Sequence, residues 1–130
     1  MAVYLDTSAA SKLVVREAET TALRRWLRQR SDEVVASDIM RTELVRATRR
    51  VAPGAVAQAR AVLDSVTLIS VSTTILERAA LLEPTTMRSL DSVHLATALD
   101  LGDELDVMVT YDHRLAEAAQ ASGLVVVAPV

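Results

Sequence analysis

Short, uninterrupted apolar runs alternate along the chain with longer segments whose apolar residues recur at helical spacing. Runs of this length without alternating polar residues are typical of strands that are buried on both faces. The predicted strands are Val3–Leu5, Val34–Ala36, Thr67–Val71, Val107–Thr110 and Leu124–Val127. The predicted helices are Ser8–Val15, Glu17–Arg30, one capped by Ser37-Asp38 that ends near Val51, Ala55–Val66, one capped by Ser72 or Thr73 that ends before Pro84, Leu90–Leu101 and Asp112–Ser122.

This order predicts an α/β fold, in which a parallel sheet carries helices on both faces as a three-layer α/β/α sandwich. Gly102 and Gly123 each follow a predicted helix, where a C-terminal glycine is common. Pro53-Gly54 separates two predicted helices and is interpreted as a turn rather than a linker. No repeat or internal boundary is visible, so residues 1–130 are expected to form one domain.

The composition narrows the class of protein. Hydrophobic residues make up 51% of the chain, which argues against disorder, and there is no cysteine for a disulfide or a thiolate metal site. No apolar run reaches the roughly 18 residues that a membrane span needs, and the first residues do not resemble a signal peptide. A cytoplasmic protein is therefore expected.

Two carboxylates stand at the ends of predicted strands. Asp6 follows the first strand and Asp112 follows the fourth. Taken alone, each could equally be a helix N-cap. Binding sites in open parallel sheets lie beyond the carboxyl ends of the strands, however, where the strand order reverses. If the first and fourth strands are neighbours, Asp6 and Asp112 face each other there.

Two further acids lie on predicted helices beside apolar residues. Glu43 adjoins the apolar stripe that includes Leu44, and its alternative interpretation is a solvated residue paired with Arg46 or Arg50. Asp91 lies in the first turn of its helix, where the helix dipole alone would favour an acid. Each residue separately has a structural explanation, but the four acids together suggest a shared site.

Four carboxylates in one crevice repel one another, and a divalent cation among them relieves that repulsion. Oxygen ligands without sulfur favour Mg²⁺ or Mn²⁺, which also bind substrate phosphates. The net charge is −3, from 17 acidic and 14 basic residues. Because a metal site would account for four of the acids, the overall acidity does not argue against a polyanionic substrate.

Four blocks of sequence resemble the PIN-domain ribonucleases, and more closely the VapC toxins of bacterial toxin–antitoxin pairs. In order, the blocks are YLDTSAASKL, SDIMRTELVRA, LDSVHLATALDLG and VTYDHRLAEAAQASGL, and they span essentially the whole chain. The resemblance implies strand order 3-2-1-4-5 and Mg²⁺- or Mn²⁺-dependent endoribonuclease activity. It also implies a VapB-like antitoxin as partner, and a homodimer or a toxin–antitoxin hetero-oligomer.

The resemblance further implies the roles of the site residues. Asp6, Asp91 and Asp112 would hold the metal, and Glu43 would ligate it or orient the attacking water. The small hydroxyls expected to support these acids by hydrogen bonding are Thr7, Ser8 and Thr110.

The basic residues and the two histidines have their own candidate roles. Arg41, Arg46 and Arg50 on the Glu43 helix, together with His113, are candidate RNA contacts, although a solvated helix face explains the arginines equally well. His94 lies one turn after Asp91 and is interpreted as a half-buried packing residue rather than a catalytic base. The stretch AVAQARAVL after the Pro-Gly turn is expected to combine core residues with a partner-binding groove.

Two rival enzyme classes lack required residues. A phosphoacceptor receiver domain would need an acceptor Asp after the third strand and a Lys after the last, but Lys12 is the only lysine. A haloacid-dehalogenase-type phosphatase would need a second Asp where Ser8 stands. The alternatives that remain are a PIN nuclease that is not a toxin and a catalytically silent PIN-like RNA-binding module.

Overall fold

The computed structural model describes all residues 1–130 and contains one five-stranded sheet, in the order β3-β2-β1-β4-β5. Every neighbouring pair is parallel. The strands are β1 (Ala2–Leu5), β2 (Glu33–Ser37), β3 (Thr67–Ile69), β4 (Leu105–Val109) and β5 (Val126–Val127). The predicted order and the adjacency of the first and fourth strands are confirmed.

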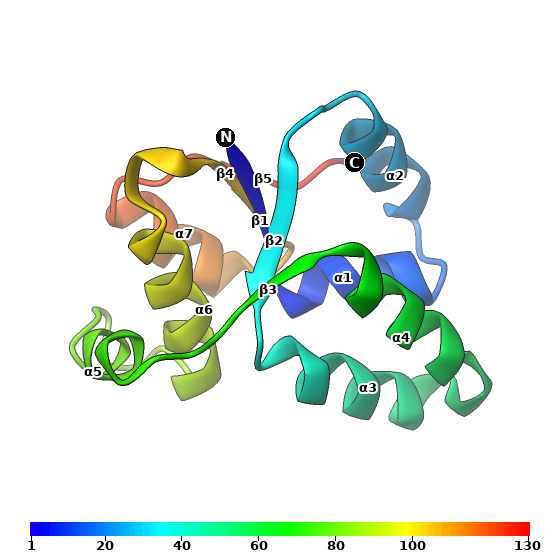
Figure 1. The fold of residues 1–130 in the computed structure, drawn as a ribbon, viewed down its shortest axis with the longest axis horizontal. Coiled ribbons are helices and arrows are strands. Elements are labelled where there is room, and N and C mark those ends of the chain that lie inside the picture. Colours follow the sequence, from blue (N-terminus) through cyan, green and yellow to red (C-terminus); the bar gives the residue numbers. More distant parts are fainter.

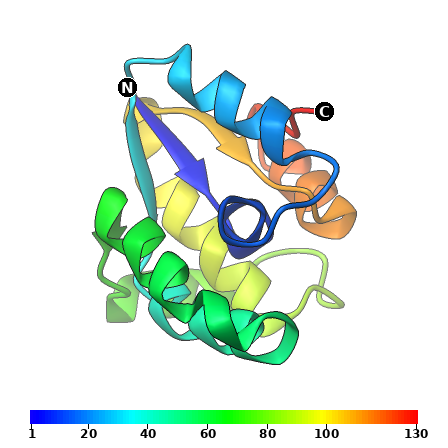
Figure 2. The same ribbon diagram turned by 90° about the vertical axis from the view of Figure 1, so that its right-hand side faces the viewer.

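The helices form two layers on either side of this sheet (Figure 1). They are α1 (Thr7–Val14), α2 (Thr20–Arg28), α3 (Met40–Val51), α4 (Val56–Ser65), α5 (Thr73–Ala80), α6 (Ser89–Asp100) and α7 (His113–Ala121), with 3-10 turns at Pro53–Ala55 and Gly102–Glu104. Helices α3 and α4 lie side by side and pack on α1 (Figure 2). None of the helices combines the length and the hydropathy that crossing a bilayer requires.

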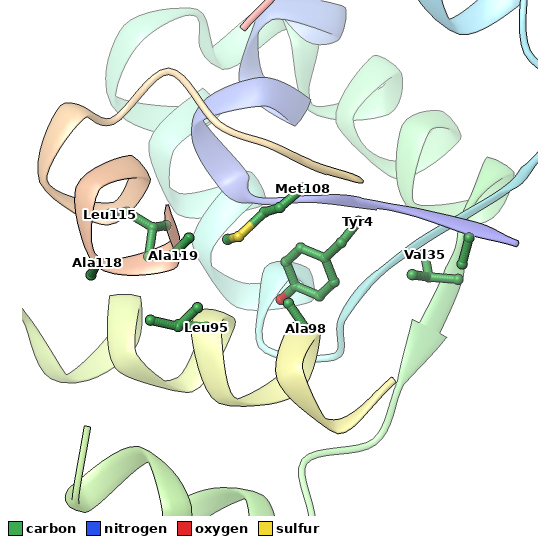
Figure 3. Close-up of a cluster of buried hydrophobic side chains, with 9 residues drawn as sticks. Tyr4, Val35, Leu95, Ala98, Met108, Leu115, Ala118 and Ala119 are labelled. Atoms are coloured by element: carbon green, nitrogen blue, oxygen red, sulfur yellow. The ribbon is translucent and has the colours of Figure 1, made fainter. Parts of the chain in front are cut away.

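Alternate residues of β1 supply the two faces of the core, as expected for a strand. Tyr4 joins Met108 against Leu95 of α6 and Leu115 of α7 (Figure 3). Val3 and Leu5 point the other way and pack with Leu23 of α2. A strand whose neighbouring residues are both buried must be apolar throughout, which explains the continuous apolar runs.

The two edge strands are shorter than the sequence predicted. Strand β3 ends at Ile69 because its partner β2 ends at Ser37, the residue it pairs with. Strand β5 begins at Val126, opposite Met108, so Leu124 precedes the ladder. The length of an edge strand is set by its single partner, and this information is absent from its own sequence.

Two predicted helix starts are wrong. Helix α2 begins at Thr20 rather than Glu17, because the Thr20 hydroxyl accepts from the Glu17 amide in a turn. Helix α3 begins at Met40 without a side-chain cap, since Asp38 Oδ1 accepts from Arg41 Nε and the Ser37 hydroxyl accepts from the Ile39 amide. The alternative between Ser72 and Thr73 is settled, because Ser72 caps α5.

Candidate active site

Asp6 lies at the carboxyl end of β1 and is only 3% exposed. It is itself the N-cap of α1, because its Oδ1 accepts from the Ala9 amide at 3.0 Å. The sequence left open whether Asp6 caps a helix, and the structure shows that it does. Ser8 Oγ instead donates to the same Oδ1 at 2.6 Å. Capping and membership of an acidic site therefore coexist in one carboxylate.

Thr110 connects the end of β4 to Asp6. Its hydroxyl donates to Asp6 Oδ2 at 2.7 Å and accepts from the Asp112 amide at 3.1 Å. The Ser8 hydroxyl accepts from the Tyr111 amide at 3.0 Å. Two hydroxyls thus tie the ends of neighbouring strands to one carboxylate, in the supporting role that the sequence assigned to Ser8 and Thr110.

Burial raises the pKa of Asp6 above its usual value. The hydroxyls of Ser8 and Thr110, the Ala9 amide and the nearby His94 all act in the opposite direction, but burial outweighs them. The structure therefore holds an acid whose negative charge is costly unless a further positive group approaches it.

Glu43 reaches the site from the first turn of α3, and its Oε1 receives two bonds. The Thr7 hydroxyl donates to it at 2.7 Å, and His94 Nε2 lies 2.6 Å away. Burial alone would raise the pKa of Glu43, but the bond to His94, the charge of that ring and the Thr7 hydroxyl lower it overall. Glu43 is therefore held as a carboxylate rather than paired with Arg46 or Arg50.

Asp91 and Asp112 complete the acidic group. Burial raises the pKa of Asp91, and the negative charges of Asp112 and Asp6 raise it further, against the opposing effects of His94 and Arg88. Asp112 caps α7 through a bond of 3.0 Å from the Leu115 amide to its Oδ1. Because the charges of Asp112 and Asp6 both act on Asp91, these three carboxylates lie within electrostatic reach of one another.

Comparison with known protein families gives a match to the PIN domain over residues 3–121, which include all four acids. The chain belongs to the PIN-domain family. A ribonuclease named VapC46 from Mycobacterium tuberculosis is 43% identical to this PIN domain over 128 residues, which is 98% of each chain.

Solved structures show the same fold. The crystal structure of VapC20 from Mycobacterium tuberculosis, described as a sarcin–ricin loop cleaving toxin, matches with a TM-score of 0.78 at 19% identity, over 98% of this chain and 99% of that one. A toxin–antitoxin complex from Klebsiella pneumoniae matches with a TM-score of 0.74 at 22% identity, over 98% of both chains. The prediction of a VapC-type PIN-domain ribonuclease is thus confirmed.

The acids of this PIN domain do not form a ready-made metal cage. No three His, Asp or Glu side chains in the structure already converge as ligands of one ion. The donor set nevertheless fits a hard divalent cation, because it consists of carboxylate oxygens. The raised pKa of Asp91 also shows a repulsion from Asp112 and Asp6 that a cation would relieve.

The predicted RNA contacts fall in three places of the PIN domain. Arg41 and Arg46 line a groove of about 580 Å³ between α3 and α4, together with Arg60, which the sequence had not singled out. Arg50 is exposed outside this lining, and His113 lines a separate cavity beside Asp112. The groove between the helices, rather than a single helix face, brings the positive charges together.

The stretch after the Pro-Gly turn contributes to the core as expected, whereas its role in partner binding stays a prediction. Ala59, Val62 and Leu63 of α4 are buried in a cluster with residues of α1 and α3. Arg60 and Ala61 are exposed.

His94 and Tyr4 are the site residues that sequence reasoning missed. His94 is 1% exposed, so it is fully buried rather than half-buried, and its ring nitrogens contact Tyr4, Glu43 and, at 3.3 Å, the Thr7 hydroxyl. Its signal was its place three residues after Asp91, on the same helix face. Tyr4 lies two residues before Asp6, on the same face of the strand.

Proposed function

We propose that this protein is a Mg²⁺- or Mn²⁺-dependent endoribonuclease that acts as the toxin of a toxin–antitoxin pair. The observation that carries the proposal is a group of four acids, two at the carboxyl ends of β1 and β4 and two in the first turns of α3 and α6. Asp6 and Asp112 are helix caps there, and Asp91 and Glu43 lie in first turns. The full-length similarity to a named VapC ribonuclease supports the same activity.

The carboxylates are the groups that would hold the metal. Asp6, Asp91 and Asp112 supply oxygens, and Asp6 is fixed by Ser8 and Thr110. A divalent ion bound there would stabilise the charge that develops on the scissile phosphate. Glu43 would ligate the ion or orient the water that attacks phosphorus, with the 3′-hydroxyl leaving and a 5′-phosphate on the product.

The groove between α3 and α4 would bind the RNA backbone near this site. Arg41 and Arg46 line this groove from α3 and Arg60 lines it from α4, and guanidinium groups suit phosphate oxygens. Arg41 is also bonded to Asp38 at 2.6 Å, so Arg46 and Arg60 are the freer pair. Arg50 and His113 would make outer contacts.

An antitoxin is the proposed protein partner, since the structural relative from Klebsiella pneumoniae is a toxin–antitoxin complex. We propose that residues 1–130 form one PIN domain that acts in the cytoplasm as a homodimer, or within a toxin–antitoxin hetero-oligomer. The molar mass in solution, measured for the protein alone and co-expressed with the product of the neighbouring gene as the proposed antitoxin, tests this assembly. A monomer in both preparations contradicts it.

The nuclease proposal is tested by cleavage of total RNA with Mg²⁺ or Mn²⁺, comparing the wild type with Asp6→Asn and Asp112→Asn. The matched control is Asp103→Asn, which removes an exposed acid from the 3-10 turn before β4. Both site variants should lose cleavage while the control keeps it. Wild-type cleavage by either site variant would sink the assignment.

The same assay separates the remaining alternatives. A silent RNA-binding module would bind RNA in the wild type and in Asp6→Asn without cleaving it, and would show no Mn²⁺ binding in a titration. A PIN nuclease that is not a toxin would cleave RNA in vitro but would not arrest growth when induced without a partner. Sequencing of RNA 5′ ends after brief induction identifies the target.

A further inference from the structure

Glu43 carries two oxygens in very different surroundings. Oε1 is bonded to Thr7 Oγ1 at 2.7 Å and to His94 Nε2 at 2.6 Å. Oε2 has no protein partner, and no side-chain oxygen in the structure is both buried and unpartnered. Oε2 is therefore open to solvent, and the bonds to Oε1 determine where it points.

The ring of His94 cannot turn freely. It is 1% exposed, and its Nδ1 lies 2.7 Å from the hydroxyl of Tyr4, which is 0% exposed. The Tyr4 and His94 rings meet edge to face, with centroids 5.9 Å apart and planes at 78°. Figure 3 shows the Tyr4 ring reaching from β1 toward α6. His94 is thus clamped between a strand and the carboxylate of Glu43.

The bonding pattern requires a proton on Nε2 whatever the charge of the ring. Burial raises the pKa of Tyr4 well above its usual value, so Tyr4 is a neutral phenol that can donate to Nδ1. A neutral ring then carries its proton on Nε2 and donates it to Glu43. A cationic ring also donates from Nε2, while Nδ1 donates to Tyr4. The hold on Glu43 is the same in both states.

We propose that His94 is a positioning residue that fixes the Glu43 carboxylate, so that Oε2 faces the reaction site, and that the Tyr4 hydroxyl holds His94 in place. The inference rests on the proposed nuclease function, because Glu43 matters only if the site cleaves RNA. Partners that orient groups at metal sites in this way typically change activity or affinity by about 10–100-fold when removed. The strand that carries Tyr4 also ends in Asp6, so β1 positions two of the four acids.

The first test is independent of activity. Nitrogen-15 NMR of the histidine rings, assigned with His94→Asn and His113→Asn, reports which nitrogen of His94 bears a proton. Nε2 should be protonated across the neutral pH range. An unprotonated Nε2 overturns the proposal, because that nitrogen could not then donate to Glu43.

The second test separates positioning from packing by two amide substitutions. His94→Gln places an amide nitrogen near the position of Nε2, whereas His94→Asn places one near Nδ1 and leaves Glu43 without its donor. His94→Asn should lower kcat for RNA cleavage by about 10–100-fold with little change in KM. His94→Gln should recover most of that loss. Equal losses in both variants overturn the positioning role.

A double substitution and a packing control complete the test. Adding His94→Asn to Glu43→Ala should change kcat by less than about twofold, since residues that act as a unit are not additive. A further loss of tenfold or more contradicts an action through Glu43. Val93→Ala, in the α5–α6 core one residue away, should lower thermal stability but not kcat. If the wild type cleaves no RNA, the nuclease proposal fails, while the NMR result still decides the bond.

Discussion

The Thr110 hydroxyl should stabilise the fold more than an ordinary buried threonine hydroxyl does. Thr110 is 1% exposed, and its hydroxyl donates to Asp6 Oδ2 at 2.7 Å. Thr110→Val removes the hydroxyl while keeping the branched shape that suits the end of a strand. Asp6 then stays buried with one donor fewer.

The expected loss follows from this one bond. A hydrogen bond to an ionised group contributes about 1.5–3 kcal/mol, against about 0.5–1.5 kcal/mol for a neutral pair. The hydroxyl also accepts from the Asp112 amide, but Asp112 is half-buried, so water can replace that bond. We therefore expect Thr110→Val to lower the free energy of unfolding by about 1.5–3 kcal/mol at pH 8. Because burial raises the pKa of Asp6, the loss should become smaller as the pH falls and Asp6 is protonated, since a neutral carboxyl needs the donor less.

Thr48→Val is the matched control for this measurement. Thr48 is 3% exposed, and its hydroxyl donates at 2.7 Å to the Leu44 carbonyl of its own helix. Because such carbonyls already accept a backbone bond, this substitution should change stability by less than about 0.5 kcal/mol. Urea unfolding with chelator present, at an m value of about 1.5 kcal/mol/M, should shift the midpoint of Thr110→Val by about 1–2 M. Equal midpoints for the two variants would refute the reasoning.

Three further outcomes are expected. Burial raises the pKa of Asp6, so the stability of the wild type falls as the pH rises through that folded-state pKa. With chelator present, the stability of Asp6→Asn relative to the wild type should therefore increase between pH 4 and pH 8. A difference in urea midpoints that does not change with pH contradicts this. Lys12 Nζ lies 2.6 Å from Glu17 Oε2, so Lys12→Met should lower the free energy of unfolding by about 1–2 kcal/mol and make the turn before α2 more accessible to protease. If neither stability nor proteolysis changes, the ion pair does not hold this turn. The double substitution Arg46→Ala and Arg60→Ala should weaken RNA binding and reduce its salt dependence. An unchanged slope of log affinity against log salt concentration would show that RNA does not bind in this groove.

The central strands were predictable because most of their residues are buried whichever face of the sheet they point to. The predicted strand Val3–Leu5 ends at the same residue as β1, and the predicted strand Val107–Thr110 ends one residue after β4. The precise limits of elements depended on contacts with other segments. The Asp38 amide donates to the Ile69 carbonyl at the end of β3, so Asp38 still belongs to the contact between β2 and β3, and no local pattern at Asp38 carries this information.

The acids of the site were predictable because each lies beside a strand end or a helix start. Their partners were not. His94 and Glu43 are 51 positions apart, and the bond between them arises only when α3 and α6 reach the same edge of the sheet. Arg60 completes the basic groove from α4, opposite two arginines of α3. Local periodicity predicts burial for His94 but cannot identify the polar groups that it meets.

The position of the four acids at helix starts lowers the cost of bringing their charges toward one edge of the sheet. Asp6 and Asp112 are N-caps, and Glu43 and Asp91 lie in first turns. Each helix N-terminus carries a partial positive charge and unpaired amides, which favour a nearby carboxylate by about 0.3–1 kcal/mol. Four such ends pointing at one edge offset part of the repulsion among the acids. Repulsion from Asp112 and Asp6 contributes to the raised pKa of Asp91, whereas burial raises the pKa of Asp6. Helix capping and metal ligation looked like alternatives in the sequence, but they are compatible, because a capping carboxylate such as that of Asp6 keeps a charge that the proposed cation would neutralise.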